Sequence, residues 1–355
     1  MKARRVLIGL AMIVAMVASA CGRSGKSQGS TNTTPPKTVV LMTYDSFAIA
    51  KSTLAAFTRE TGFTVKVLRA GDAGQLVSTA IQVKDHPEAD ALFGVDNTFL
   101  TRALDEGLFD PYAAKALSTV PKQFQLDAGH HVTPIDSGEV CVNDDLAWFG
   151  HDGHPTAPSS LADLVKPEYK KLLVMENPAT SSPGLAFLLA TISASGDGWQ
   201  SYWKALRSNG VRVDDGWDQA YDTDFTASGA SGDRPLVVSY GTDPAADVVF
   251  SDGKKAKPTV GVVPGTCFSQ VEFAGVLHGA KNPTGAQALV DFMLSSQYQE
   301  GIPLQMYVYP VVTGTKLPPV FTKFAPQPKA YSLSAAAIGA HRSAWIDEWT
   351  QIVLQ

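Results

Sequence analysis

Short apolar runs alternate with amphipathic segments between residues 38 and 107. Each apolar run has the length of a strand, and the segments between the runs repeat apolar side chains at helical spacing. The expected strands are Thr38–Thr43, Phe63–Leu68 and Ala89–Gly94, and the expected helices are Ser52–Thr61, a segment through Leu76, Ala80 and Ile81, and Thr98–Glu106. Gly62 and Gly107 stand where two of these helices should end, because glycine readily takes the left-handed conformation of a C-cap. Strands that alternate with helices predict a parallel sheet covered by helices.

The same alternation returns after residue 170. Strands are expected here at Leu172–Met175, Val211–Val213 and Leu236–Tyr240, and helices at Pro183–Thr191, Gly198–Ser208, Gly285–Leu294 and Ala335–Val353. Cys267–Leu277 is a long apolar segment suited to cross from one lobe to another. The chain of 355 residues is also longer than one hydrophobic core usually holds. The pattern therefore predicts an α/β fold of two lobes joined by extended crossings.

The N-terminal segment differs from the rest of the chain. Val6 to Ala20 is an uncharged apolar run of 15 residues directly after three basic residues. It is too short for a confident membrane span and typical of a signal peptide over residues 1–20. The run ends in the sequence Ala-Ser-Ala-Cys at Cys21, which resembles the lipobox of bacterial lipoproteins. The resemblance implies that Cys21 carries a lipid anchor and becomes the first mature residue. The alternative is a plain signal peptide followed by an accidental cysteine.

Residues 21–37 follow as a tether. They are rich in Ser, Gly, Thr, Asn and Pro and contain no large apolar side chain, so this segment is expected to stay flexible. Loss of residues 1–20 removes three basic and no acidic residues, which changes the formal net charge from −5 to −8. This acidic balance argues against a nucleic-acid partner. A hydrophobic content of 45% excludes a disordered chain and a polytopic membrane protein.

Two further cysteines, Cys141 and Cys267, lie in strand-like segments. Export would place them in an oxidising compartment, where such a pair often forms a disulfide. Two buried free thiols are the alternative.

Polar loops follow the expected strands. Ligands of open α/β sheets bind beyond the carboxyl ends of the strands, so these loops are the first candidates for a site. They contain carboxylates, hydroxyls and aromatic rings but no Lys or Arg, and they comprise residues 44–46, 71–74, 95–97, 180–184, 216–217 and 240–244. Ring faces and carboxylates both attract a cation, which predicts an organic cation as ligand. The alternative is that Asp45 and Asp96 merely cap helices.

The hydroxyl-rich loop 180–184 has a second interpretation. Hydroxyl residues before Pro183 mark a helix N-terminus, whose free N–H groups bind a hydroxyl or a phosphate. A capped helix without a ligand is the alternative. The His residues are scattered, and G-x-S-x-G, P-loop and dinucleotide-binding motifs are missing from the sequence. We therefore expect a protein without metal, cofactor or catalytic activity.

A series of motifs occurs in collinear order across about residues 38–350. They are Thr-Tyr-Asp-Ser-Phe from Thr43, Ala-Asp-Ala-Leu-Phe-Gly-Val-Asp-Asn from Ala89, Asn-Pro-Ala-Thr-Ser-Ser-Pro-Gly-Leu from Asn177, Gly-Trp-Asp-Gln-Ala-Tyr from Gly216, Leu-Val-Val-Ser-Tyr from Leu236, Gln-Val-Glu from Gln270, Tyr-Pro-Val from Tyr309 and His-Arg-Ser-Ala-Trp-Ile-Asp-Glu-Trp from His341. This set resembles the thiamine-binding proteins of bacterial ABC importers. The resemblance implies the two-lobed, hinge-closing type II periplasmic-binding-protein fold, with a mainly parallel sheet flanked by helices in each lobe. Lobe 1 would comprise residues 38–135 and 270–318, and lobe 2 residues 136–269 and 319–355.

The resemblance also implies a set of ligand contacts. Carried over position by position, they are Asp72, Ala73, Ser181, Ser182, Trp217, Tyr240, Gly241, Thr242, Asp243 and Pro244, with Tyr44 and Asp45 lining the same cleft. Asp96, in the loop after the third strand, and Tyr307, where the family has a Trp, complete the candidate set. Aromatic residues would hold the cationic ligand and acidic residues, Glu139 included, would balance its charge. Ser181 and Ser182 would bind its hydroxyethyl or phosphate end.

The chain departs from the family pattern in its aromatic residues. Ala246 and Glu139 stand where the family has aromatic rings, and Lys51 lies near a third such position. The wall of rings around the ligand is therefore expected to be partly rebuilt, and Glu139 would disfavour a diphosphate.

These observations predict a monomeric, extracytoplasmic lipoprotein that captures thiamine or its phosphate esters and delivers it to an ABC permease with its ATPase. It would contact the membrane through the lipid anchor alone. One alternative is a carrier for another cation, such as a polyamine or ferric iron. A second is a surface-anchored α/β hydrolase.

Overall fold

The computed structural model describes residues 37–355. The predicted signal peptide, Cys21 and all but the last residue of the predicted tether lie outside the described residues. Within residues 37–355, no helix combines the length and the apolar character that a membrane span requires.

In the described part of the chain, eleven strands form one continuous sheet. They are β1 (Thr38–Thr43), β2 (Thr64–Arg69), β3 (Ala91–Asp96), β4 (Phe109–Asp110), β5 (Thr133–Asp145), β6 (Leu173–Glu176), β7 (Arg212–Asp214), β8 (Leu236–Tyr240), β9 (Val260–Val262), β10 (Phe268–Leu277) and β11 (Tyr309–Pro310). The main strand order is β2-β1-β3-β10-β5-β8-β6-β7, and the short strands β4, β9 and β11 pair alongside it.

Thirteen α-helices accompany the sheet over the described part of the chain. They are α1 (Lys51–Thr61), α2 (Ala73–Gln82), α3 (Leu100–Asp105), α4 (Leu146–Phe149), α5 (Ser182–Ser195), α6 (Trp199–Ser208), α7 (Trp217–Gln219), α8 (Asp243–Phe250), α9 (Pro283–Met293), α10 (Ser296–Gln299), α11 (Ile302–Gln305), α12 (Pro319–Phe324) and α13 (Ala335–Val353). Short 3₁₀ turns cover residues 117–119, 122–124, 163–165, 167–169 and 196–198, and a π-turn, Ala220–Asp224, follows α7.

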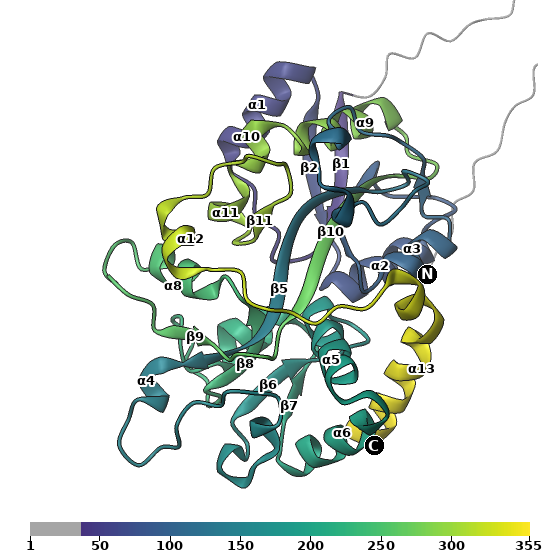
Figure 1. The fold of residues 1–355 in the computed structure, drawn as a ribbon. Coiled ribbons are helices and arrows are strands. Elements are labelled where there is room, and N and C mark those ends of the chain that lie inside the picture. The colour runs from purple at the N-terminus through teal and green to yellow at the C-terminus, as the bar shows by residue number, and fades with distance from the viewer. Residues whose placement is uncertain (1–36) are drawn as a thin grey trace, which may run out of the picture. The chain divides into compact units, whose positions relative to one another are not determined.

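The sheet has two parallel groups joined by antiparallel strands. β1 runs parallel to β2 and β3, and β6 runs parallel to β7 and β8, as the alternation of strands and helices predicts. Between the groups, β10 and β5 pair antiparallel with each other. Figure 1 shows them as two long strands that run from the half of the molecule with β1 and β2 to the half with β6, β7 and β8. The predicted crossing segment is therefore β10, and β5 is a second crossing strand that the apolar pattern does not reveal.

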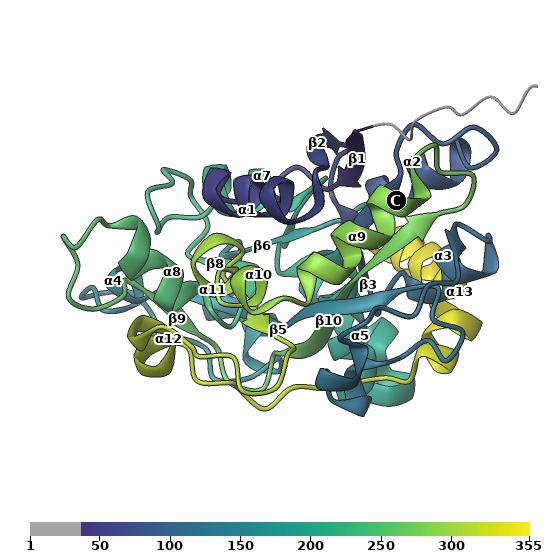
Figure 2. The same cartoon turned by 90° about the horizontal axis from the view of Figure 1, so that it is seen from above.

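Helices cover both faces of the crossing strands. α9 and α5 lie on opposite sides of β10 in Figure 2. All residues of α5 from Ser182 to Ile192 are buried, because this helix is packed on every side. Trp203 of α6 lies between Phe187 of α5 and Trp349 of α13, with ring centroids 5.7 and 5.6 Å away. Large buried rings of this kind contribute much of the hydrophobic stabilisation of a core.

A disulfide joins Cys141 on β5 to Cys267, directly before β10. Both cysteines are fully buried. The bond links the two crossing strands at the end near β8, since Cys141 is also paired with Ser239 of that strand. It therefore restrains the strands that join the two parallel groups.

Candidate functional site

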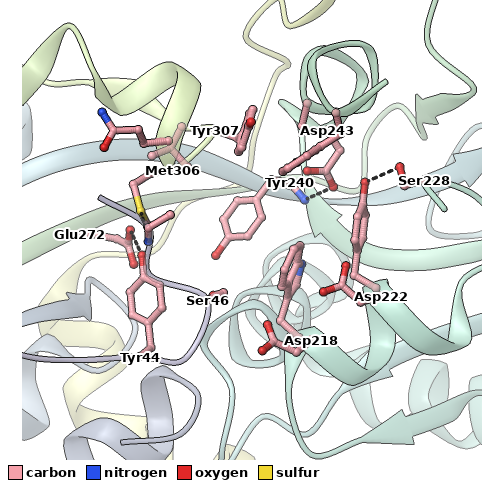
Figure 3. A pocket seen from close by; sticks show the side chains of 17 residues that line it. Tyr44, Ser46, Asp218, Asp222, Ser228, Tyr240, Asp243, Glu272, Met306 and Tyr307 are labelled. Carbon is pink, nitrogen blue, oxygen red and sulfur yellow. Dashed lines mark hydrogen bonds between the residues drawn. The ribbon is translucent and has the colours of Figure 1, made fainter. Parts of the chain in front are cut away.

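Loops after β1, β7 and β8 and the segment after α11 surround a cavity of about 440 Å³. Figure 3 shows Tyr44, Tyr240, Glu272 and Tyr307 facing this space from different elements. The lining residues are Tyr44, Ser46, Ala48, Trp217, Asp218, Tyr221, Asp222, Ser228, Tyr240, Asp243, Ala246, Phe250, Glu272, Gln305, Met306, Tyr307 and Val308. A volume of this size is typical of a small-molecule site.

The cavity is acidic. Asp218, Asp222, Asp243 and Glu272 line it, and the lining residues in the described part of the chain include no Lys, Arg or His. Asp243 and Glu272 are each only 4% exposed, whereas Asp218 and Asp222 lie at the surface. Buried carboxylates interact strongly with a positive charge because solvent screens the attraction only weakly. The cavity is therefore built to bind a cation and to repel an anion.

Trp217 is held in place by four neighbours. Its backbone N–H donates to Asp72 Oδ2 at 2.8 Å, and its Nε1–H donates to Ser239 Oγ at 2.8 Å. Its ring stacks on Tyr221 at 4.8 Å between centroids, with the planes 13° apart. Tyr240 approaches the same indole edge-on, at 6.4 Å. These contacts keep the Trp217 ring ready to stack on a flat ligand.

A carboxylate pair lies at the floor of the cavity. Glu272 of β10 is directly opposite Asp136 of β5 in the strand register, and both are almost fully buried. The Tyr44 hydroxyl donates to Glu272 Oε2 at 3.1 Å. Burial raises the pKa of Glu272 to about 7, and burial beside Glu272 raises the pKa of Asp136 well above its usual range. Two adjacent buried carboxyl groups favour a state that retains a proton.

Asp243 supplies a second buried carboxylate. Its Oδ2 accepts hydrogen bonds from Asn143 Nδ2 at 2.5 Å and from the Tyr240 backbone N–H at 3.1 Å. Burial raises its pKa to about 7, against the opposing effect of these hydrogen bonds. Charge on this group therefore depends on pH near neutrality.

A smaller cavity of about 200 Å³ shares Ser46, Trp217 and Asp218 with the first. Asp45 and Asp72 also line it. Asp72 is the N-cap of α2 and accepts a hydrogen bond from the Ala73 N–H at 2.5 Å. Burial raises its pKa to about 6. The acidic lining thus continues from one cavity into the other.

The structure brings many of the predicted ligand contacts together. Tyr44, Trp217, Tyr240, Asp243 and Tyr307 line the main cavity, and Asp45 and Asp72 line the adjoining one. Ala73 and Ser182 meet Asp72 in a third pocket of about 20 Å³. Asp96, Ser181, Gly241, Thr242 and Pro244 line none of these three cavities.

Asp96 lies below the site in a buried hydrogen-bond network. It accepts hydrogen bonds from the Ser182 hydroxyl and from Gln270 Nε2, the latter at 3.1 Å. It also accepts from the Thr98 N–H at 3.0 Å, in the turn before α3. Neither Asp96 nor Asp45 is the N-cap of the helix that follows it, because the N-cap of α3 is Phe99 and that of α1 is Ala50. Asp96 therefore connects β3, α5 and β10 beneath the site.

Several lining residues are missing from the predicted set, notably Asp218, Tyr221, Asp222, Phe250 and Glu272. Glu272 had a signal, since it is the one charged residue of the apolar segment Cys267–Leu277. Asp218 and Asp222 are four residues apart and follow the Gly-Trp motif. Phe250 carries no sequence signal, because only the packing of α8 brings its ring to the cavity.

The residues at which the chain departs from the family pattern lie in different places in the structure. Ala246 lines the main cavity, and Phe250, one helical turn later on α8, contributes a ring beside it. Glu139 and Lys51 line none of the three cavities. Burial nevertheless raises the pKa of Glu139 to about 7.

Across residues 37–355, no group of three or more His, Cys, Asp or Glu side chains is arranged to hold a metal ion.

The fold and this site between the parallel groups define the class of type II periplasmic binding proteins. Residues 87–332 match the model of the bacterial extracellular solute-binding protein family, and the chain belongs to that family. It is a binding protein and not an enzyme, which overturns the alternative of a surface-anchored hydrolase.

Individual relatives and solved structures show which members of the family this chain is similar to. The chain is 30% identical to the thiamine-binding periplasmic protein of Escherichia coli (strain K12), over 89% of this chain and 93% of that protein. A solved structure of a periplasmic thiamin binding protein superposes with a TM-score of 0.77 at 28% identity, over 89% of this chain and 96% of that one. Iron-bound HitA from Pseudomonas aeruginosa superposes with a TM-score of 0.69 at 20% identity, over 89% of this chain and 99% of that one, which is a likeness of fold alone.

Proposed function

We propose that this protein captures thiamine outside the cytoplasm and delivers it to an ABC importer. The observation that carries the proposal is the main cavity, where four carboxylates and six aromatic rings meet without a basic side chain among the described residues. Thiamine is a flat aromatic cation, so ring faces and carboxylates recognise it together. The thiamine-binding relatives support the same ligand.

The binding roles follow from the positions of the side chains. Trp217, Tyr240 and Tyr44 present rings to the ligand, and Glu272 and Asp243 balance its positive charge. Asp45 and Asp72 extend the negative potential into the adjoining cavity. Glu139 lies outside the three cavities and is left out of this set.

We propose a division of the chain into two lobes that close on the ligand by a hinge, lobe 1 being residues 38–135 and 270–318 and lobe 2 residues 136–269 and 319–355. The contacts that would join the lobes include the Trp217 N–H to Asp72, the Gln75 N–H to the Thr180 carbonyl at 3.1 Å, and the Ser182 hydroxyl to Asp96. A ligand favours closure only by the difference in its affinity for the closed and open forms. Residues that contact it from both lobes supply that difference.

The hydroxyethyl end of the ligand, or a phosphate on it, would lie at the N-terminus of α5. Ser182 lines the small third pocket beside Asp72, and Ser181 is the N-cap of the helix. Because Asp72 and Glu272 also line this pocket, a phosphate would meet two carboxylates there. We therefore expect thiamine to bind more tightly than its monophosphate.

The cellular setting extends the proposal. Cys21 would anchor a monomeric protein to the outer face of the cell membrane, and the closed form would dock on the permease and its ATPase. Incorporation of labelled palmitate that is lost in Cys21→Ala tests the anchor. An unlabelled wild-type chain contradicts it.

Calorimetric titration of the chain with thiamine, thiamine monophosphate, spermidine and ferric citrate tests the ligand. We expect micromolar or tighter binding of thiamine, weaker binding of its monophosphate, and no comparable binding of the other two. Ser182→Ala should weaken the two thiamine compounds unequally if the pocket at α5 holds the phosphate. Absence of thiamine binding at micromolar concentration overturns the proposal, and binding of spermidine or ferric ion in its place establishes the alternative cation carrier.

A further inference from the structure

Two aromatic rings meet at the mouth of the main cavity. Phe250, the last residue of α8, lines the cavity although its side chain is 70% exposed, which places it at the boundary with solvent. Its ring lies 4.8 Å from that of Tyr307, with the planes 39° apart. A ligand or partner that covered this ring would gain from the burial of its apolar surface.

Residues at both ends of helix α8 contact Tyr307. Thr242, the N-cap of α8, donates a hydrogen bond from its hydroxyl to the Tyr307 carbonyl, while Phe250 contacts the Tyr307 ring. Tyr307 has a φ of 56°, a left-handed conformation that bulky side chains rarely adopt. Strained backbone of this kind persists only where the surroundings impose it, and it concentrates at binding sites.

Space for a ligand lies behind these two rings. Ala246 is one helical turn before Phe250 on α8, it is buried, and its small side chain also lines the cavity. The cavity therefore stays open beneath the rings, and Trp217 and Tyr240 line the same space. A flat ligand that occupies it would have aromatic neighbours both inside and at the mouth.

We infer that Phe250 and Tyr307 form an aromatic gate that retains a ring-bearing cation and selects it over an aliphatic one. The inference rests on the proposed function, because thiamine is the ring-bearing cation in question. Thr242 and Phe250 of α8 both contact Tyr307, and Tyr307 packs against the cluster that contains Ala245 of the same helix, so the two rings are held together at the mouth of the cavity. The gate thus acts on ligand release, the step through which most differences in affinity arise.

Stopped-flow fluorescence with thiamine measures that step. Phe250→Ala should accelerate release about three- to tenfold, the range expected for loss of one aromatic contact, while the association rate changes little. Phe250→Trp should restore slow release, and Phe250→Leu should not, because it keeps an apolar side chain without a ring. Leu146→Ala is the matched control, since Leu146 is 45% exposed and lies outside the cavities.

Selectivity is measured with choline, an aliphatic quaternary ammonium. Phe250→Ala should narrow the ratio of thiamine to choline affinity by the same factor, because choline has no ring for the gate to contact. Release of thiamine from Phe250→Ala at the wild-type rate overturns the gate, even though thiamine binding by the wild type still supports the proposed function.

A measurement without ligand tests the aromatic gate even if the wild type does not bind thiamine. Failure of the gate and failure of the proposed function are then distinguishable. Acrylamide quenching is compared in chains with Trp217 and with Trp217→Phe, so that the difference reports Trp217 alone. Phe250→Ala should make Trp217 more accessible to quencher than Leu146→Ala does. Equal quenching in the two variants overturns the gate, whatever the ligand.

Discussion

Glu272 and Asp243 are buried acids that face a space sized for an organic cation. Burial raises the pKa of each to about 7, so a large share of both groups is protonated in the empty site near neutral pH. A bound cation stabilises the ionised form and lowers these pKa values. Ligand capture at this site therefore releases protons.

The first prediction concerns the pH dependence of thiamine binding. The cation binds the deprotonated carboxylates, so its affinity should rise as pH rises from 6 to 8, by up to about tenfold per pH unit for each proton released. Calorimetry in buffers of different ionisation enthalpy measures the number of protons directly. An affinity that stays constant from pH 6 to 8 contradicts the prediction.

Glu272→Gln provides the control for that experiment. Glutamine keeps the size of the side chain and a hydrogen-bonding oxygen for Tyr44 but cannot ionise. This variant should bind thiamine more weakly at pH 8 and show a flatter pH profile. The remaining slope then reports the other buried acids near the ligand, among them Asp243, Asp136 and Asp72.

At the level of elements, β5 and β10 contribute residues to the site and also connect the two parallel groups of strands. Asp136 and Glu272 face each other where these strands pass the cavity, and the disulfide ties the strands further along. The Cys141 sulfur also lies beside the turn that follows β8, since a Cβ on Gly241 would approach it to 3.3 Å. The disulfide thus supports the turn that presents Asp243.

The second prediction is that the double substitution Cys141→Ser and Cys267→Ser destabilises the protein. The bond closes a loop of sequence separation 126, and removal of a disulfide that closes so long a loop typically costs about 2–5 kcal/mol. Thermal unfolding of the variant should begin at a lower temperature than that of the wild type. The wild type treated with a reductant is the control, and it should shift in the same direction. An unchanged melting temperature contradicts a stabilising role.

Most elements could be predicted from local patterns, but β5 could not. Strands β1 and β3 each contain a central run of apolar residues, whereas β5 contains Asp136, Glu139 and two consecutive aspartates at its end. Those charges do not fit the pattern of a buried strand, and only the assembled sheet reveals that β5 lies between β10 and β8. The polar loops after the expected strands indicated Trp217 and Asp243 as site residues. Glu272 and Phe250 lie outside those loops, and tertiary packing brings them to the cavity.

At the level of the whole molecule, the acidic site opposes folding stability. Burial raises the folded-state pKa of Asp72 to about 6 and of Asp243, Glu272 and Glu139 to about 7, above the range of about 4 expected for the unfolded chain. The unfolded chain therefore ionises these groups more readily. Their protonation stabilises the folded state at low pH, and that stabilisation is lost as pH rises through 6 and 7.

The third prediction follows from this loss of stability with rising pH. Without ligand, the melting temperature should fall by several degrees between pH 5 and pH 8. Saturating thiamine should reduce or reverse that fall, because a ligand that binds only the folded state stabilises it, and this ligand binds best at high pH. Differential scanning calorimetry at the two pH values, with and without thiamine, measures both effects. A ligand-free protein that is more stable at pH 8 than at pH 5 contradicts the prediction.

The central place of β10 in the sheet has a consequence for synthesis. Its neighbours are β3 and β5, so the sheet stays divided until residue 277 has been made. A growing chain therefore cannot complete the fold before more than three quarters of its 355 residues exist. Pairing of segments so distant along the chain is slow, because loop closure must precede the contacts that reward it. The sheet therefore stays incomplete during most of synthesis.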